Sequence, residues 1–133
     1  MAIVLDTDVL IEEEKGLFDL KGWTSSLRDE RFQVAAITIA ELWHGVERAN
    51  ATYRAEREAY VRTLLNSVAI LPYTEATAFE HARIWAELES SGNMIGYYDL
   101  VIAATAAQHG SAVATFNERH FSKVRGLKVI RPT

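Results

Sequence analysis

Short apolar runs alternate with longer amphipathic stretches along this chain. The apolar runs are rich in small or β-branched residues and are short enough to be buried strands. They cover residues 2–5, 32–37, 68–71, 111–115 and, more weakly, 127–130. Helical periodicity occupies the segments between them, at residues 9–15, 17–28, 38–49, 53–66, 74–91 and 99–109.

This alternation predicts an α/β fold. Strands that are apolar on both faces belong in a parallel sheet with helices on both sides. The chain has no repeat and no linker rich in Pro, Gly or Ser, so we expect residues 1–133 to form a single domain with four to five strands. Segment 99–109 is apolar almost all round, which indicates a buried helix that ends at Gly110.

Composition limits the classes of function. The chain has no cysteine, which excludes disulfides, thiolate metal sites and a cysteine nucleophile. No apolar run is long enough to span a bilayer, and Asp6 interrupts an N-terminus that lacks early Lys or Arg. We therefore expect no membrane association, no signal peptide and a cytoplasmic location. The formal net charge of −4 argues against non-specific coating of nucleic acid, although residues 118–133 hold five basic side chains against one acidic side chain.

Polar residues follow several of the predicted strands. Asp6 comes directly after the first strand, and Asn117 comes two residues after the fourth. Glu41 lies one turn into the helix after the second strand, and Asp99 opens the buried helix. Open parallel sheets place their sites at the carboxyl ends of the strands, so we expect these side chains to converge there.

Each acid also has a purely structural interpretation. Thr38 and Glu41 have the spacing of a capping box, in which Glu41 only binds a backbone N–H. Asp99 at a helix start can simply compensate the helix dipole. Asp8 is expected to be the N-cap of helix 9–15. The functional interpretation depends on three acids, Asp6, Glu41 and Asp99, meeting at one edge of one sheet.

Three carboxylates at one edge would need a cation or bound protons. Two like charges about 4 Å apart repel by roughly 4 kcal/mol at an effective dielectric constant of about 20. Oxygen ligands suit Mg²⁺, which can activate water for attack on a phosphodiester. The sequence shows no Ser-His-Asp arrangement and no glycine-rich phosphate loop. The histidines form no pair with metal-ligand spacing, and three are expected at the surface or at helix ends: His44, His81 and His109.

Four stretches together resemble the PIN-domain endoribonucleases, and among them the VapC-type toxins of toxin–antitoxin modules. The stretches are "VLDTDVLI", "ITIAELWHGVERA", "YYDLVIAATAAQHG" and "VATFNERHFSKVRGLKVI". The resemblance covers nearly the whole chain. It implies a PIN-like fold and cleavage of RNA that depends on Mg²⁺, with Mn²⁺ as the alternative ion.

The resemblance also implies roles for single residues. It makes Asp6 and Asp99 metal ligands and Glu41 the third acid of the metal site. Thr115 matches a hydroxyl position near the site, and Thr7 stands beside the first Asp in a supporting position.

The segment after the fourth strand departs from the family pattern. Asn117 takes a catalytic position where many relatives have Asp, and His120 stands where others have an acid. Asn117 brings no negative charge, which leaves the number of metal ions open. Arg119, Lys123 and Arg125 follow directly and are expected to bind RNA phosphates near the site.

The resemblance implies two protein partners, a second copy of the chain and a small VapB-like antitoxin whose tail lies across the acids. Apolar residues on the predicted helices are candidates for the antitoxin groove, although each also fits plain core packing. They are Leu17, Phe18, Leu20, Trp23 and Trp43.

Two alternative functions remain open at this point. Asp6-Thr7-Asp8 looks like the D-x-D start of haloacid-dehalogenase-type phosphatases, with Asp6 as nucleophile and Asp8 as acid–base. Leu10 and the lack of an Asp-Asp pair near the C-terminus argue against that family. The second alternative is a PIN-like module that binds RNA or protein with weak or no cleavage, which Asn117 keeps open.

Overall fold

The computed structural model describes residues 1–133 and contains a five-stranded, wholly parallel sheet. Its strands are β1 (Ala2–Leu5), β2 (Arg31–Ala35), β3 (Ala69–Leu71), β4 (Ala112–Ala114) and β5 (Val129–Ile130), in the order β3-β2-β1-β4-β5. The predicted fold class is confirmed. Strand β1 lies at the centre, and Leu5 at its carboxyl end pairs in register with Ala114 of β4.

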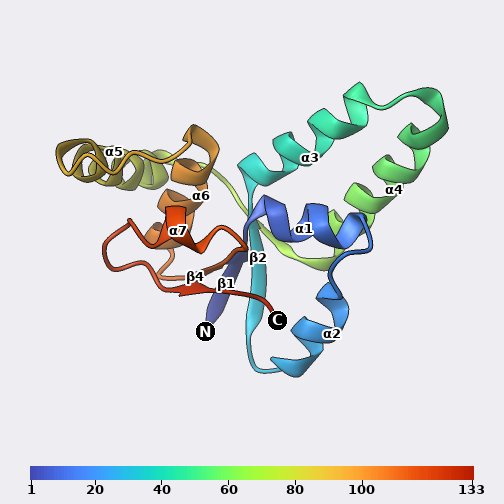
Figure 1. Cartoon of the computed structure of the whole chain (residues 1–133), viewed down its shortest axis with the longest axis horizontal. Coiled ribbons are helices and arrows are strands. Elements are labelled where there is room, and N and C mark those ends of the chain that lie inside the picture. The colour runs from blue at the N-terminus through green and yellow to red at the C-terminus, as the bar shows by residue number, and fades with distance from the viewer.

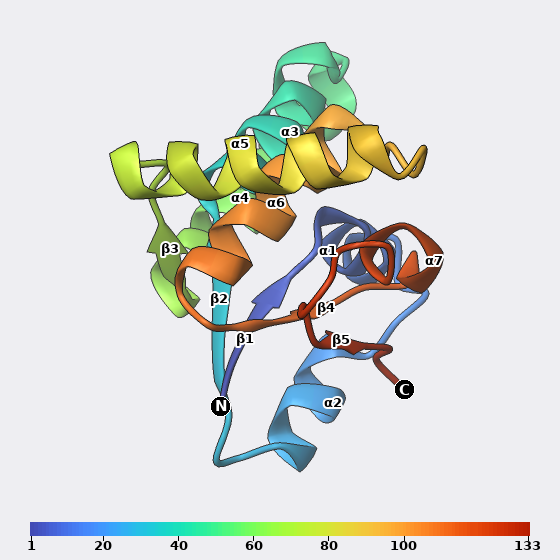
Figure 2. The ribbon, with the colours of Figure 1, turned by 90° about the vertical axis from the view of Figure 1, so that its left-hand side faces the viewer.

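Seven helices cover the two faces of the sheet (Figure 1). On one face lie α1 (Thr7–Glu14), α2 (Leu20–Ser26), α3 (Ala36–Arg48) and α4 (Ala51–Ser67). On the other lie α5 (Glu75–Ser90), α6 (Tyr97–Gln108) and the short α7 (Glu118–Phe121). In the turned view, α5 packs across α6 on that second face (Figure 2). None of these helices is both long enough and apolar enough to cross a membrane.

Each face of the sheet has its own apolar core. Val4 and Val113 face α5 and α6, whereas Ile3 and Leu5 face α1 to α4, because successive side chains of a strand point to opposite sides. Residues 100–106 of α6 are all buried, which confirms the prediction of a buried helix there. Gly110 follows with a φ of 65°, a left-handed conformation that favours glycine after a helix.

Several predicted boundaries are wrong, and one error matters for the site. The predicted strand 32–37 ends at Ala35, because Ala36 and Ile37 already belong to α3. Ile37 packs against the core of α5 and α6, so its apolar character reflects helix packing instead of a strand. The predicted helix 17–28 is only α2, and α7 has no counterpart in the prediction. As a consequence of the earlier start of α3, Thr38 lies inside that helix.

Candidate functional site

Asp6 is fixed at the carboxyl end of β1. Its backbone N–H donates to the carbonyl of Ala114 at 2.9 Å, which extends the pairing of β1 with β4 by one residue. Its Oδ1 accepts a hydrogen bond from the Thr7 N–H at 2.8 Å, so Asp6 is the N-cap of α1. Its Oδ2 accepts a 2.7 Å bond from the hydroxyl of Thr115, just after β4.

The environment of Asp6 disfavours a bare carboxylate. The residue is only 4% exposed. Burial and, to a lesser extent, the charges of Asp8 and Asp99 together raise the pKa of Asp6 from its ordinary 3.8 to about 8, against the opposing effect of the hydrogen bond from Thr115. At neutral pH, Asp6 therefore holds a proton unless a cation compensates its charge.

Asp8 belongs to the first turn of α1 and is not its N-cap, contrary to the prediction. Its carboxylate accepts a hydrogen bond from the backbone N–H of Phe116 at 3.2 Å. Burial raises the pKa of Asp8, while that N–H opposes the rise. Asp8 thus ties the segment after β4 to α1 and adds a second negative charge close to Asp6.

Glu41 reaches the same edge from α3. Its Oε1 accepts a 2.6 Å hydrogen bond from the hydroxyl of Thr7, which also lies 3.0 Å from the hydroxyl of Thr38. The N-cap of α3 is Ala35, without any side-chain cap, so the predicted capping box of Thr38 and Glu41 is wrong. Burial raises the pKa of Glu41, and the Thr7 bond works against the rise.

Asp99 lies in the first turn of α6 and contacts the segment after β4. Its Oδ2 is 3.0 Å from Nδ1 of His120, and that nitrogen is 2.8 Å from Nδ2 of Asn117. The charge of Asp99 raises the pKa values of Asp6 and Glu41, so these three acids from β1, α3 and α6 share one electrostatic environment.

The donor chemistry of this edge fits a divalent cation. Carboxylate oxygens, the amide of Asn117 and the imidazole of His120 are all metal ligands in proteins. No group of three His, Asp or Glu side chains is close enough to form a complete ligand cluster as the side chains lie. No Lys or Arg pairs with Asp6, Asp8 or Glu41 either. The negative charge at the edge is therefore left for a proton or a cation to balance.

The predicted phosphate-binding residues lie on α7 and in the segment after it. Arg119 is exposed on α7, whereas Lys123 and Arg125 border a hollow beside the C-terminal end of α5. Arg131 is the basic residue that sequence reasoning missed. It shares a hollow of about 360 Å³ with Asp8, and its Nη1 donates to the carbonyl of Phe116 at 2.9 Å. The sequence shows Arg131 only as one residue of the basic C-terminal segment. Its position near Asp8 depends on the pairing of β5 with β4.

Two of the candidate residues for the antitoxin groove, Leu20 and Trp23, are buried, so the alternative of core packing holds for them. Trp43 is half-buried on α3. The two candidate residues before α2 also remain at the surface: Leu17 is exposed and Phe18 is half-buried. Both border the hollow that contains Asp8 and Arg131.

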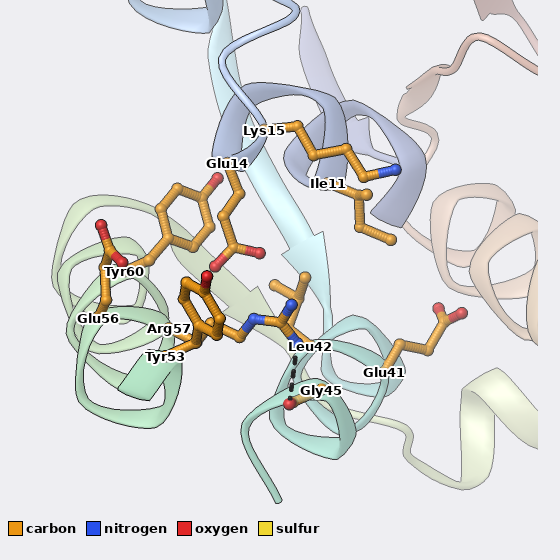
Figure 3. Close-up of a pocket in the computed structure, with 10 residues that line it drawn as sticks. All are labelled: Ile11, Glu14, Lys15, Glu41, Leu42, Gly45, Tyr53, Glu56, Arg57 and Tyr60. Carbon is orange, nitrogen blue, oxygen red and sulfur yellow. Dashed lines mark hydrogen bonds between the residues drawn. The ribbon is translucent and has the colours of Figure 1, made fainter. Parts of the chain in front are cut away.

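A larger hollow, of about 520 Å³, opens between α1, α3 and α4. Figure 3 shows Glu41 at one end of this hollow and Tyr60 and Glu56 at the other. Between them, Nη1 of Arg57 donates a 3.3 Å hydrogen bond to the carbonyl of Gly45. Ile11 and Leu42 contribute its apolar lining. The hollow therefore leads from the surface of α4 to one of the site acids.

An aromatic face covers α5 and the start of α6. We define it by the exposed residues Tyr73, Phe79, Trp85, Met94, Tyr97 and Tyr98. His81 lies beneath it, buried and not at the surface as predicted, with Nδ1 2.8 Å from the hydroxyl of Tyr73. Phe79 is 70% exposed and Trp85 49%, so α5 presents large aromatic side chains to solvent.

Comparison with known proteins gives consistent matches over nearly the whole chain. The family model of the PIN domain matches residues 3–127. Ribonuclease VapC1 of Rickettsia felis is 30% identical over 131 residues, which cover 98% of this chain and 96% of that protein. The tRNA(fMet)-specific endonuclease VapC of Salmonella typhimurium is 30% identical over 129 residues, covering 97% and 96%. The structure of DNA-bound VapBC from Salmonella typhimurium superposes with a TM-score of 0.89 at 28% identity, covering 98% of each chain.

Proposed function

The chain belongs to the PIN-domain family, and we propose on that basis that it is a divalent-metal-dependent endoribonuclease, the toxin of a VapBC-like toxin–antitoxin pair. The family match rules against the haloacid-dehalogenase interpretation of Asp6 and Asp8. An RNA substrate and a chain without cysteine both suit a cytoplasmic location, which is part of the proposal.

One observation carries the proposal: the buried carboxylate of Asp6. A carboxylate with a pKa near 8 and no cationic partner is costly unless something binds it. We assign Asp6 and Asp99 as metal ligands, with Glu41 as the third acid and Asn117 as the uncharged member of the set. Mg²⁺ suits these acids, because it binds through one or two carboxylates and keeps waters for the reaction.

Neighbouring hydrogen-bond donors fix the orientation of the acidic side chains. Thr115 holds Oδ2 of Asp6, the Phe116 N–H holds Asp8, and Thr7 holds Oε1 of Glu41. A bound divalent cation would supply an activated water for attack on the phosphodiester and stabilise the negative charge that develops on phosphate oxygens. The hydrogen bonds keep the acids oriented before RNA arrives, so little reorganisation is needed during the reaction.

We place the cognate antitoxin in the hollow between α1, α3 and α4. The apolar lining by Ile11 and Leu42 suits a short apolar segment, and the hollow ends at Glu41. A basic side chain of the antitoxin at that end would pair with Glu41 and compensate the charge that a cation otherwise balances. Binding there would therefore compete with the cation for the site.

The second partner is another copy of the chain, seated on the aromatic face. Several large apolar side chains on α5 and the start of α6 are exposed together, which is typical of a protein–protein interface. Sedimentation equilibrium tests this: the wild type should be a dimer, and Trp85→Glu with Phe79→Glu should be a monomer. A monomeric wild type would contradict this assignment.

Incubation of the purified protein with total RNA, with Mg²⁺ or with EDTA, tests the enzymatic proposal. An initiator tRNA transcript is a suitable defined substrate, since a relative is named for its action on tRNA(fMet). We expect discrete fragments with Mg²⁺, and none with EDTA or with Asp6→Asn. RNA binding without fragments would favour the alternative that Asn117 keeps open, a PIN-like module that binds without cleaving.

A further inference from the structure

His120 is the one basic side chain that contacts the acid edge. Its Nδ1 lies 3.0 Å from Oδ2 of Asp99, and none of the other ion pairs of the chain includes a site acid. The same nitrogen lies 2.8 Å from Nδ2 of Asn117. The residue thus joins the acid from α6 to the amide that follows β4.

The backbone of His120 is held by its neighbours, whereas its side chain is partly exposed. The neighbouring Phe121 is completely buried and anchors α7 in the core, and the N–H of His120 donates to the carbonyl of Asn117 at 3.2 Å. The imidazole itself is 42% exposed. Part of the ring is therefore accessible from solvent while Nδ1 lies beside Asp99.

We propose that His120 is a nitrogen ligand of the divalent-cation site beside Asp99, and that it shifts the preference of the site from Mg²⁺ toward transition-metal ions such as Mn²⁺. The inference rests on the proposed function, because it concerns the cation of that same site. Mg²⁺ takes oxygen ligands almost exclusively, whereas imidazole is a common ligand of first-row transition metals. Asn117, in contact with the ring, acts as a positioning residue for His120.

Electron paramagnetic resonance of the protein with Mn²⁺ alone tests this directly. A coordinated imidazole gives ¹⁴N modulation of the Mn²⁺ echo, which carboxylates and water do not give. We expect ¹⁴N modulation in the wild type and its loss in His120→Asp, which retains an oxygen ligand at this position. The ratio of Mn²⁺ to Mg²⁺ affinity, measured by competition, should fall by roughly tenfold in that variant.

Two matched controls separate His120 from the other histidines. His44 lies one turn after Glu41 on α3 and is exposed, and His109 is exposed at the far end of α6. His44→Ala and His109→Ala should both keep the ¹⁴N modulation and the affinity ratio. Circular dichroism melting of each variant confirms that it is folded before the spectra are compared.

The outcomes distinguish this inference from the function it rests on. Bound Mn²⁺ without ¹⁴N modulation, or modulation that survives in His120→Asp, would overturn the role of His120 and leave the metal-dependent nuclease standing. A protein that binds no Mn²⁺ at all would overturn both.

Discussion

The hydroxyl of Thr115 donates a 2.7 Å hydrogen bond to the carboxylate of Asp6, across 109 positions of the sequence. The bond forms because β1 and β4 are neighbours and end side by side, with Leu5 opposite Ala114. It leaves Asp6 buried and oriented toward other acids.

Replacing Asp6 by Asn should abolish RNA cleavage and stabilise the fold. Asn retains the cap on the Thr7 N–H, so α1 keeps its start, while the buried charge and its repulsion with Asp8 and Asp99 are removed. We expect the melting temperature at pH 8 without divalent ions to rise by about 3–6 °C, the equivalent of roughly 1–2 kcal/mol in a chain of this size.

Asp19→Asn is the matched control for this substitution. Asp19 is also an N-cap Asp, because its carboxylate accepts from the Gly22 N–H at 2.9 Å, but it is exposed and lies outside the acid edge. It should leave both cleavage and melting temperature unchanged. Wild-type cleavage by Asp6→Asn would show that Asp6 is not part of the catalytic site.

The stability difference between wild type and Asp6→Asn should depend on pH. The pKa of Asp6 has its ordinary value of 3.8 in the unfolded chain and is about 8 in the folded chain. Between these values the folded chain holds the extra proton, so the contribution of Asp6 to the free energy of unfolding falls as pH rises and reaches its minimum above about pH 8.

Urea unfolding in EDTA at pH 5 and pH 8.5 measures this dependence. The advantage of Asp6→Asn over the wild type should be larger at pH 8.5, and Mg²⁺ should reduce it by binding the ionised site. An advantage that is the same at both pH values would show that Asp6 titrates normally.

Thr7→Val tests the bond that orients Glu41. Val keeps the shape of Thr but cannot donate to Oε1, so Glu41 loses a 2.6 Å hydrogen bond in a half-buried position. We expect the free energy of unfolding to fall by about 1 kcal/mol and cleavage to fall with it. Thr7→Ser, which restores the donor, should recover most of both; equal loss in the two variants would assign the effect to packing.

Asn117→Asp tests whether the uncharged residue of the proposed metal site contributes to cation binding. A carboxylate here adds a negative charge beside Asp99 and His120. An additional negative charge about 4 Å from a cation is favourable by several kcal/mol at an effective dielectric constant of about 20. The loss of hydration of the carboxylate offsets much of this gain. We therefore expect divalent affinity to rise about tenfold in calorimetric titrations. Unchanged affinity would place Asn117 outside the metal site.

The sequence predicts most of the fold because its periodicity is unambiguous where burial is complete. The consecutive apolar residues of α6 and the apolar β1 have no other stable placement than the interior. The end of β2 could not be found in this way. Ile37 is apolar both as a strand residue and as a helix residue, and only its packing against the core of α5 and α6 decides between them.

The convergence of Asp6, Glu41 and Asp99 could be predicted from the rule for parallel sheets, but their hydrogen bonds could not. The capping interpretations of Asp8 and Glu41 failed because each side chain has a partner distant in sequence, the Phe116 N–H and the Thr7 hydroxyl. Local spacing cannot reveal such partners.

The two basic positions beside the acids required the tertiary structure. Arg131 borders the same hollow as Asp8 only because β5 pairs with β4, and His120 reaches Asp99 only because α7 turns back toward α6. Neither the basic composition of the C-terminal segment nor its motif specifies those approaches.

The anomalous difference map of a crystal soaked in Mn²⁺ tests the central claim most directly, that acids from β1, α3 and α6 jointly bind one divalent cation. We expect a peak within coordination distance of Asp6 and Asp99, with Glu41 turned toward it. A well-ordered site without any peak between Asp6 and Asp99, or a peak bound only by other residues, would contradict it.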